Sequence, residues 1–198
     1  MKAIILLSIL MLFSLLCAEV IFYDDFDRPN GAVGNGWVNI GPSTSSIENG
    51  VLKLISDNNK GIRREFDPIT SGIYYVQFDW KIGANDWLAN AFPNDFPAHL
   101  LWDYNGDIYR DPDSNMSAPI LLANVALNTW TTVRWKINIG TNRYSLWIDG
   151  NLVADNILGN TVNSFFRFTF RSTAGSTTTQ YVDNFLVFNE VPPPIPQN

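Results

Sequence analysis

The sequence contains little material for acid–base or nucleophilic catalysis. Its single histidine is His99, its single cysteine is Cys17, and its four glutamates stand at positions 19, 48, 65 and 190. No Ser-His-Asp set, phosphate-binding loop or Cys/His zinc spacing is found, and one histidine leaves little material for a catalytic or zinc site. A lone histidine is more often a satisfied polar residue than a catalyst. These residues favour binding over catalysis.

Side chains suited to holding a sugar are more plentiful. Aromatic rings pack against the C–H faces of sugars, and planar polar side chains bond their hydroxyl groups. Eight residues on predicted solvent faces or in loops form the candidate ligand-binding set: Tyr75, Gln77, Asp79, Trp87, His99, Asp103, Arg134 and Trp147. Trp87 and Phe92 fall in a long loop, where they would form a platform at the rim. The alternative interpretation is that several of these residues only cover the outer face of a sheet.

An acidic string runs from Asp103 to Asp113. It resembles a calcium-binding EF-hand loop, but Ser114 stands at the twelfth position, where such a loop has a glutamate. A tight hairpin at Asn105-Gly106 explains the same residues, because Asn and Gly tolerate positive φ. The hairpin is the preferred interpretation.

Strands must position these side chains. Apolar and polar residues alternate repeatedly from Glu19 to Glu190, and no convincing helical period appears. The alternation is clearest in four segments: 73–82, 131–139, 144–148 and 165–171. Turn signals at Asn105-Gly106 and Asp149-Gly150 predict hairpins, and residues 85–97 form the longest irregular stretch, which has the length of a functional loop. The pattern predicts antiparallel sheets with one buried and one solvent face.

Composition excludes several classes of protein. The chain has 198 residues, of which 46% are hydrophobic and 16% charged, so it is neither disordered nor a multipass membrane protein. Its length fits one domain. The formal net charge of −6 argues against nucleic acid and anionic membrane surfaces as partners, because both require a basic face.

The first 18 residues have the form of a secretory signal peptide. Lys2 is followed by an uncharged, mostly apolar stretch that ends at Ala18. Cleavage after Ala18 leaves a domain of residues 19–190 with no cysteine and a proline-rich tail of residues 191–198. The sequence therefore predicts a secreted protein, extracellular or periplasmic, with no membrane insertion after signal cleavage.

Two alternatives to the signal peptide stay open. A retained anchor helix is disfavoured because the apolar run is short for a ~20-residue membrane span. A lipoprotein is disfavoured because Leu16, rather than a small residue, precedes Cys17.

Three parts of the sequence resemble secreted concanavalin A-like (laminin-G-like) jelly rolls. The segment Phe22-Tyr23-Asp24-Asp25-Phe26-Asp27-Arg28-Pro29-Asn30-Gly31, followed by Gly34-Asn35-Gly36-Trp37, resembles the first strand and loop of that family. Residues 130–136 and 144–150 resemble its paired central strands, and residues 180–188 resemble its closing strand. The resemblance covers nearly all of residues 20–189. It implies an all-β, antiparallel two-sheet jelly-roll sandwich of the concanavalin A-like type.

The resemblance also implies a structural calcium ion. In laminarinase-type relatives, the first and last strands lie side by side and share a Ca²⁺ ion, which prefers six to eight oxygen ligands. The matching positions in this sequence are Asp25, Gly34, Asn35 and Asp183. The alternative is that Asp183 simply accepts hydrogen bonds from amides of the first strand.

Enzymes of the same fold offer a second comparison. Laminarinase-type hydrolases carry two glutamates in a Glu-x-Asp-x-x-Glu strand, and no glutamate here has that spacing. Lyases on this fold use a His or Tyr base and an Arg or Gln that neutralises a uronate carboxylate. His99 and Arg167, with Tyr75, Gln77 and Arg134, would supply those groups, although the family's Gln-Ile-His motif is absent.

The function that the sequence favours is non-catalytic, lectin-like recognition of an extracellular glycan, with a structural calcium ion. The first alternative is a polysaccharide-degrading enzyme, for which a lyase is favoured over a hydrolase. The second alternative is a cell-surface adhesive module with a protein partner.

Overall fold

The computed structural model describes residues 18–41, 44–57, 60–83, 89–93, 99–111, 119–159, 164–172 and 177–189. Within these ranges every regular element is a β-strand, and there is no helix long and apolar enough to span a membrane. The strands are β1 (Val20–Asp24), β2 (Trp37–Ile40), β3 (Thr44–Glu48), β4 (Val51–Asp57), β5 (Gly61–Ile69), β6 (Ile73–Ile82), β7 (Ala89–Pro93), β8 (His99–Trp102), β9 (Asp107–Asp111), β10 (Ile120–Asn124), β11 (Thr131–Asn138), β12 (Arg143–Ile148), β13 (Asn151–Leu158), β14 (Phe165–Ser172) and β15 (Thr177–Asn189).

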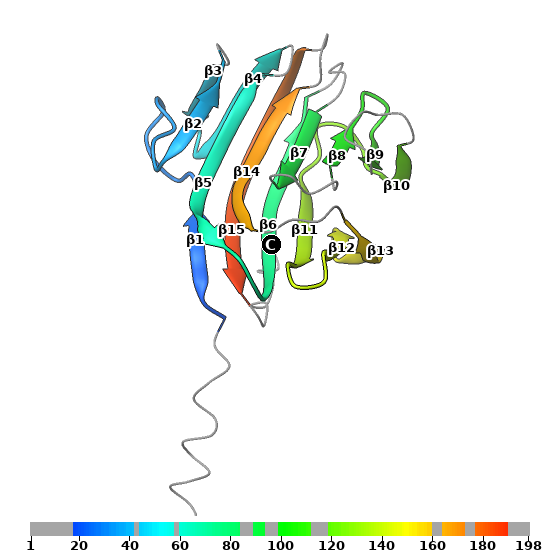
Figure 1. Ribbon diagram of the computed structural model, residues 1–198. Helices are drawn as coiled ribbons and strands as arrows, with labels where there is room; N and C mark the ends of the chain where they lie inside the picture. Colours follow the sequence, from blue (N-terminus) through cyan, green and yellow to red (C-terminus); the bar gives the residue numbers. More distant parts are fainter. Residues whose placement is uncertain are drawn as a thin grey trace, which may run out of the picture.

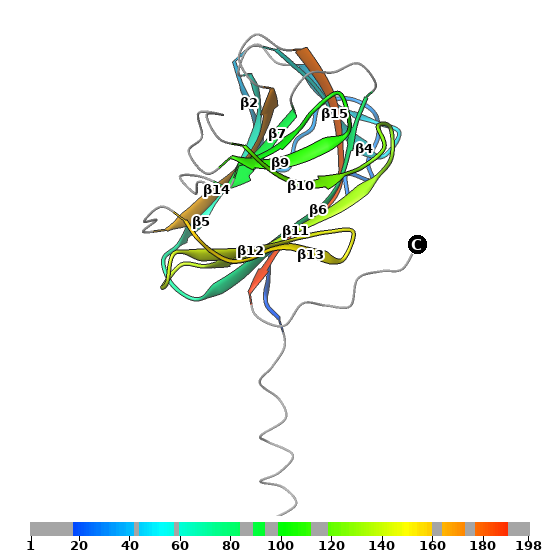
Figure 2. The same ribbon diagram turned by 90° about the vertical axis from the view of Figure 1, so that its right-hand side faces the viewer.

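The strands form two antiparallel sheets that pack face to face (Figures 1 and 2). Sheet A has the order β13-β12-β11-β6-β15-β4-β3, and β1 pairs with β15 beside β4. Sheet B has the order β10-β9-β8-β7-β14-β5-β2. Figure 2 shows β9 and β10 of sheet B on one side of the molecule and β11, β12 and β13 of sheet A on the other. The predicted two-sheet jelly-roll sandwich is confirmed.

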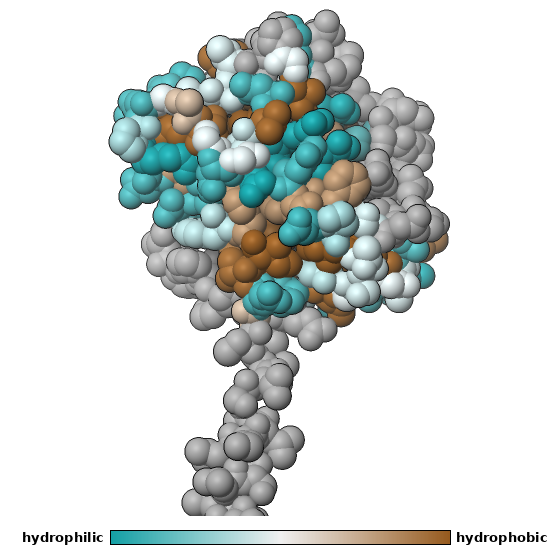
Figure 3. Space-filling view, turned by 60° about the vertical axis from the view of Figure 1, so that its left-hand side comes forward, coloured by the Kyte–Doolittle hydropathy of each residue, from teal (hydrophilic) through white to brown (hydrophobic). Residues whose placement is uncertain are grey.

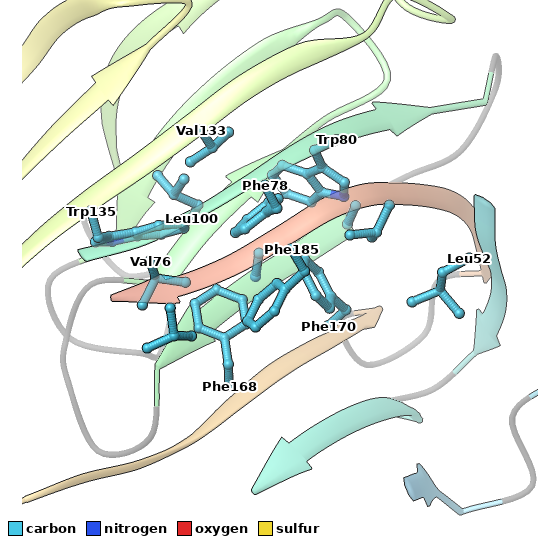
Figure 4. Close-up of a cluster of buried hydrophobic side chains, with 14 of the residues drawn as sticks. Leu52, Val76, Phe78, Trp80, Leu100, Val133, Trp135, Phe168, Phe170 and Phe185 are labelled. Carbon is cyan, nitrogen blue, oxygen red and sulfur yellow. The ribbon is translucent and has the colours of Figure 1, made fainter. Parts of the chain in front are cut away.

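Aromatic side chains fill the space between the sheets. Figure 4 shows Phe168 and Phe170 of β14 directed toward Phe78 and Phe185 of sheet A. The ring centroids of Phe78 and Phe170 lie 4.9 Å apart in an edge-to-face arrangement, and those of Phe168 and Phe185 lie 5.3 Å apart. Burying a side chain of this size contributes roughly 1.5–3 kcal/mol to the free energy of unfolding. Residues 19–190 contain no cysteine and therefore no disulfide, so the two sheets depend on this core to hold them together.

The beginning of the domain pairs with its end. Strand β1 runs antiparallel to β15, with Asp24 opposite Phe185 and Val20 opposite Phe188 (Figure 1). On its other edge, β15 pairs with β6. A bulge between Asp183 and Leu186, where Asn184 has a φ of 51°, shifts this second register. The junction of β1 and β15 is the place where the resemblance puts the calcium ion.

The predicted loop at residues 85–97 is wrong at its centre. Residues 89–93 form strand β7, which pairs with β14 on one edge and β8 on the other. All five residues of β7 are buried, so no alternation marks the strand, and Phe92 lies in the strand rather than in a loop. The flanking residues, including Trp87, lie outside the described ranges. So do the predicted signal peptide, apart from Ala18, and the proline-rich tail.

Candidate functional site

The sequence-predicted ligand residues do not meet at one place. Five of them lie on the outer face of sheet A, which we call the paired face: Tyr75, Gln77 and Asp79 on β6, Arg134 on β11 and Trp147 on β12. His99 lies on β8 of sheet B, and Asp103 lies in the turn that follows β8. The structure therefore brings five of the seven described candidates together and separates His99 and Asp103 from them.

Side chains on the paired face bond to one another. Arg134 donates from Nε and Nη2 to Gln77 Oε1, at 2.7 and 2.5 Å. Asp79 accepts one hydrogen bond from Thr132 Oγ1 at 2.6 Å and another from Asn184 Nδ2 at 2.9 Å. Hydrogen bonds made within the protein leave these groups less available to a ligand.

The two aromatic candidates on the paired face, Tyr75 and Trp147, each have a neighbour within the protein. The ring of Tyr75 stacks on Phe188 with centroids 5.0 Å apart and planes 6° apart. Trp147 stands opposite Arg134 on the neighbouring strand.

A polar hollow of about 300 Å³ lies farther along β11, β12 and β13. Two residues that line this hollow are hydrogen-bonded to each other, because Ser145 Oγ donates to Asp155 Oδ1 at 2.8 Å.

Asp103 caps a hairpin turn. Its Oδ1 accepts hydrogen bonds from the backbone N–H groups of Asn105, at 2.8 Å, and Asp107, at 3.0 Å. Gly106 has a φ of 85°, and a Cβ there would meet the carbonyl oxygen of Val125 at 2.3 Å. The turn joins β8 to β9, which confirms the predicted hairpin at Asn105-Gly106.

The outer face of sheet B carries a different arrangement, which we call the belt: Asn90, Phe92, His99, Asp111, Thr169 and Arg171. Cross-strand register places these residues side by side, since Arg171 is opposite Asn90, Thr169 is opposite Phe92 and His99 is opposite Asp111. Phe92 is buried but is not part of the core cluster between the sheets. The belt therefore faces away from the core and crosses β14, β7, β8 and β9.

Two rings and a guanidinium form the middle of the belt. Phe92 and His99 stack with centroids 4.2 Å apart and planes 28° apart. The Cζ atom of Arg171 lies 4.7 Å from the centroid of Phe92, within cation–π range. The stack is therefore a nearly buried pair of rings with a positive charge at one end.

Burial controls the charge state of the belt. His99 is only 8% exposed and Asp111 only 1%. Burial, together with the nearby charge of Arg171, lowers the pKa of His99 to about 4, while Asp111 opposes the shift. Burial also lowers the pKa of Arg171. At neutral pH, His99 is an uncharged ring and Arg171 is a half-buried cation.

Two polar groups of the belt lack partners within the described part of the chain. Asn90 is 3% exposed, yet its Oδ1 accepts no hydrogen bond. Nε of Arg171 donates none, and Arg171 has no carboxylate partner among the described residues. A buried acceptor without a donor costs about 1–3 kcal/mol. Such groups in a native protein call for a ligand or bound water.

Most of the belt was not identified from the sequence. Of its members, the candidate set includes only His99, and Phe92 was assigned to a loop. The alternation of Arg167, Thr169 and Arg171 with phenylalanines is visible in residues 165–171, so the outward direction of these side chains was available. Their neighbours were not, because the pairing of β14 with β7 has no signal in the local sequence.

Gly34 and Asn35 of the predicted calcium set form hydrogen bonds within the protein. The backbone oxygen of Gly34 accepts a hydrogen bond from the N–H group of Trp37 at 3.0 Å, and Asn35 Nδ2 donates to Asp24 Oδ2 at 3.1 Å. Asp183 lies close to the charges of Asp79 and Asp25. Burial, followed by repulsion from Asp79 and Asp25, raises the pKa of Asp183 to about 6.

Asp24, beside the predicted ligand Asp25, anchors the loop after β1. Its two carboxylate oxygens accept five hydrogen bonds: from Phe26 N, Arg28 Nη1, Arg28 Nη2, Asn35 Nδ2 and Trp37 Nε1. Burial alone would raise the pKa of Asp24, but these bonds, led by the one from Arg28, hold that pKa below its ordinary value. Asp24 is therefore a structural residue whose charge is already neutralised.

A further hollow, of about 440 Å³, opens between β1 and β5. Figure 3 brings this side of the molecule forward and shows apolar surface low on the face with polar surface above it. In the hollow, the Arg64 Cζ atom lies 4.4 Å from the ring centroid of Phe22 and 5.5 Å from that of Phe66. The guanidinium group of Arg64 is therefore already in contact with the rings of Phe22 and Phe66.

No family model matches the chain, and no curated protein matches it by sequence. Solved structures do match. A sialidase superposes with a TM-score of 0.68 at 16% identity over 86% of this chain, which spans only 18% of that protein. SCLam, a non-specific endo-β-1,3(4)-glucanase from family GH16, superposes with a TM-score of 0.63 at 12% identity, covering 88% of this chain and 92% of its own.

A third match is the carbohydrate recognition domain of Emp46p in its potassium-bound form, with a TM-score of 0.57 at 12% identity over 87% of this chain and 97% of that one. The chain has the concanavalin A-like jelly-roll fold. Because a fold of this kind supports many activities, the concanavalin A-like assignment fixes the architecture and leaves the function to the side chains. Within this concanavalin A-like sandwich, the belt lies on the sheet that contains neither terminal strand.

Proposed function

We propose that this chain is a secreted, non-catalytic glycan-binding module and that the belt on sheet B is its binding site. The observation that supports this most strongly is the buried Phe92–His99 stack with Arg171 at its end. A sugar offers C–H faces to rings and hydroxyl groups to polar side chains. The belt supplies the rings and adds Asn90 Oδ1, an acceptor without a donor in the described part of the chain.

The paired face is the weaker candidate, although the sequence placed more residues there. Gln77 and Arg134 bond to each other, and Tyr75 stacks on Phe188. A ligand would have to displace these contacts, which subtracts from its binding free energy. Trp147 stays a candidate for contact with a ligand at the edge of this face.

A polysaccharide lyase is the second candidate, and the uncharged state of His99 favours it. An imidazole that is neutral at pH 7 is available to accept a proton from an acidic sugar. General bases, however, work best when their pKa lies near the working pH. With its pKa at about 4, His99 is a weak base, and this supports binding over elimination.

We also propose that a calcium ion binds beside Asp183. The raised pKa of Asp183 reflects a half-buried carboxylate that lies close to Asp79 and Asp25, an environment that a cation would relieve. Within the described residues, no three His, Cys, Asp or Glu side chains are grouped closely enough to hold a metal alone. Calcium would therefore also need backbone or amide oxygens, for which Gly34 and Asn35 are the predicted donors.

Glycan-array binding tests the main proposal. We expect wild-type protein to bind at least one glycan and Phe92→Ala to lose at least tenfold in affinity, because the substitution removes one ring of the stack. The melting curve of the variant checks that it folds. A wild-type protein that binds no glycan, or a folded Phe92→Ala variant that binds normally, contradicts the proposal. Incubation of the same glycans with the protein, followed by ultraviolet absorbance, detects the unsaturated product of a lyase.

Chelation tests the calcium proposal. A ligand that binds only the folded state stabilises it, so saturation at 100 times Kd corresponds to about 2.7 kcal/mol, or roughly 5–10 °C in Tm. We expect a chelator to lower the Tm of the wild type and to leave Asp183→Asn unaffected. An identical Tm with and without chelator rejects the ion.

Mass spectrometry of exported protein tests secretion, with Glu19 expected as the first residue.

A further inference from the structure

Two strand edges lie open beside the hollow between β1 and β5. Strand β1 pairs with β15 on one edge, and no described strand pairs with its other edge. Strand β2 pairs with β5 only from Gly61 to Arg64, so residues 65–69 of β5 also have a free edge within the described ranges. Free strand edges invite pairing with other chains, and native proteins usually cover them. This corner of the sandwich therefore calls for a cover.

The hollow has an apolar lining and one unused hydrogen-bond donor. Ile21, Phe22 and Phe66 contribute to the lining, and all three are partly exposed. The rings of Phe22 and Phe66 meet edge-to-face with centroids 5.7 Å apart. Arg64 lies over both rings, and its Nε atom is buried without a hydrogen-bond partner in the described part of the chain. Such a site suits an apolar ligand that accepts a hydrogen bond.

The proline-rich tail has the matching chemistry. Residues 191–196 read Val-Pro-Pro-Pro-Ile-Pro. Each proline offers an apolar ring and a carbonyl acceptor but no N–H donor, so this segment cannot pair with the free edge of β1 as a regular strand. Proline-rich segments instead pack against aromatic side chains in an extended form, in which every carbonyl is available to a donor. Phe22 and Phe66 supply the rings, and Arg64 Nε supplies the donor.

The tail also starts close enough to reach the hollow. The N–H group of Asn189, the last described residue, donates to the carbonyl oxygen of Glu19 at 3.0 Å, so β15 ends beside the start of β1 (Figure 1). Ile21 follows Glu19 by two residues, or about 7 Å of strand. Residues 192–196 span about 15 Å in an extended proline-rich form. The tail is therefore long enough to turn past Glu19 and lie along the hollow.

We propose that residues 191–196 of the same molecule dock in the hollow between β1 and β5. The prolines pack against Phe22 and Phe66, and one tail carbonyl accepts a hydrogen bond from Arg64 Nε. The docked tail covers the free edge of β1 and connects the last strand of sheet A to β5 of sheet B. It therefore acts as a strap that joins the two sheets where the domain begins and ends. This surface is separate from the belt and does not depend on glycan binding.

Introduced cysteines test the proposal, because Cys17 is the only cysteine of the chain. In a Cys17→Ser background, Asp67→Cys places one thiol at the hollow and Ile195→Cys places another in the tail. We expect this pair to form an intramolecular disulfide roughly tenfold faster than the control pair of Leu158→Cys with Ile195→Cys. Leu158 is 65% exposed and lies on β13, at the opposite edge of sheet A.

Non-reducing mass spectrometry and size-exclusion chromatography separate the outcomes. A disulfide within one molecule supports the strap. A disulfide that joins two molecules would mean that the tail of a second copy fills the hollow, which overturns the intramolecular proposal. Equal rates for the two cysteine pairs overturn the docking itself.

Substitutions in the full chain test the contacts. Pro193→Ser combined with Pro194→Ser should lower the Tm by roughly 2–4 °C, because the docked rings are lost. The same pair should lower the Tm less in an Arg64→Lys background, because lysine has no donor at the position of Nε. Arg63→Lys makes the same exchange one residue away and should leave the effect of the serine pair unchanged. An unchanged Tm in the serine variant overturns the proposal, and an equal effect in the Arg64→Lys background overturns the hydrogen bond to Arg64.

Discussion

The two outer faces of the sandwich differ in how their polar groups are partnered. On sheet A, Arg134 donates two hydrogen bonds to Gln77, and Asp79 accepts bonds from Thr132 and Asn184. On sheet B, Arg171 lies against the ring of Phe92 and has no carboxylate partner among the described residues. Polar side chains of the paired face are therefore hydrogen-bonded to one another, whereas Asn90 Oδ1 and Arg171 Nε of the belt have no hydrogen-bond partner in the described part of the chain.

On the function proposed above, the paired face is a solvent-facing polar surface and the belt is the binding surface. Partnered groups stabilise the fold and gain little from a ligand, because new bonds only replace existing ones. Groups that are buried without partners reduce the stability of the free protein and regain that free energy when a ligand binds. The belt should therefore respond to mutation and pH differently from the paired face.

The largest expected effect is the pH dependence that His99 gives to stability. Its pKa falls from an ordinary value of 6.5 to about 4 in the folded protein, so the unfolded chain binds more protons between these values. The contribution of His99 to the free energy of unfolding therefore rises with pH from about 4 to 6.5, by roughly 3 kcal/mol, and is lost in acid. The charged groups facing it are Arg171, which lowers the pKa, and Asp111, which raises it.

Denaturant unfolding from pH 4 to pH 7 measures this effect, with His99→Gln as the comparison. The variant keeps a polar planar group but cannot titrate, so its stability should change less over this range. Asp183 works in the opposite sense, because its raised pKa makes stability fall as pH rises from about 4 to 6. It is present in both proteins, so the difference between them isolates His99. Identical pH profiles would show that the belt does not bury an uncharged His99.

The fold was largely predictable from the sequence, because alternation is a local signal. The interval 73–82 alternates in sequence and forms β6 over the same bounds, and the closing strand pairs with β1 as the resemblance implies. Strand β7 escaped prediction because all five of its residues are buried and only one of them, Asn90, is polar, so no alternation marks an outer face. Its position between Asn-rich and Pro-rich segments made it resemble a loop.

The candidate site was much less predictable, for a physical reason. Alternation shows that Gln77 and Arg134 point to solvent, but it does not show that they bond to each other. Asn90 and Arg171 become neighbours only through the pairing of β7 with β14, which joins segments far apart in the chain. Whether a polar residue is free or partnered depends on register between strands, and a single sequence does not encode that register locally.

The second expected effect compares one arginine from each face. Arg134→Met leaves the nearly buried Gln77 Oε1 without its donor, which should destabilise the protein by about 1–3 kcal/mol. Arg171→Met removes a half-buried charge that has no carboxylate partner in the described ranges, so stability should be unchanged or increased. Thermal and denaturant unfolding of the two variants measure the difference. Equal destabilisation by both substitutions would mean that the two faces are partnered alike.

The smallest expected effect is the loss of stability in Tyr75→Ala, a variant that also tests which of the two faces binds the glycan. Tyr75→Ala removes the ring that stacks on Phe188, and such a pair contributes about 1 kcal/mol beyond the area it buries. The variant should therefore be slightly less stable, while its affinity for the glycan found on the array should equal that of the wild type. Affinity is measured on folded protein, well below the melting temperature of the variant. If Tyr75→Ala loses binding and Phe92→Ala keeps it, the glycan lies on the paired face, and internal hydrogen bonding is then no guide to which face of this sandwich binds a ligand.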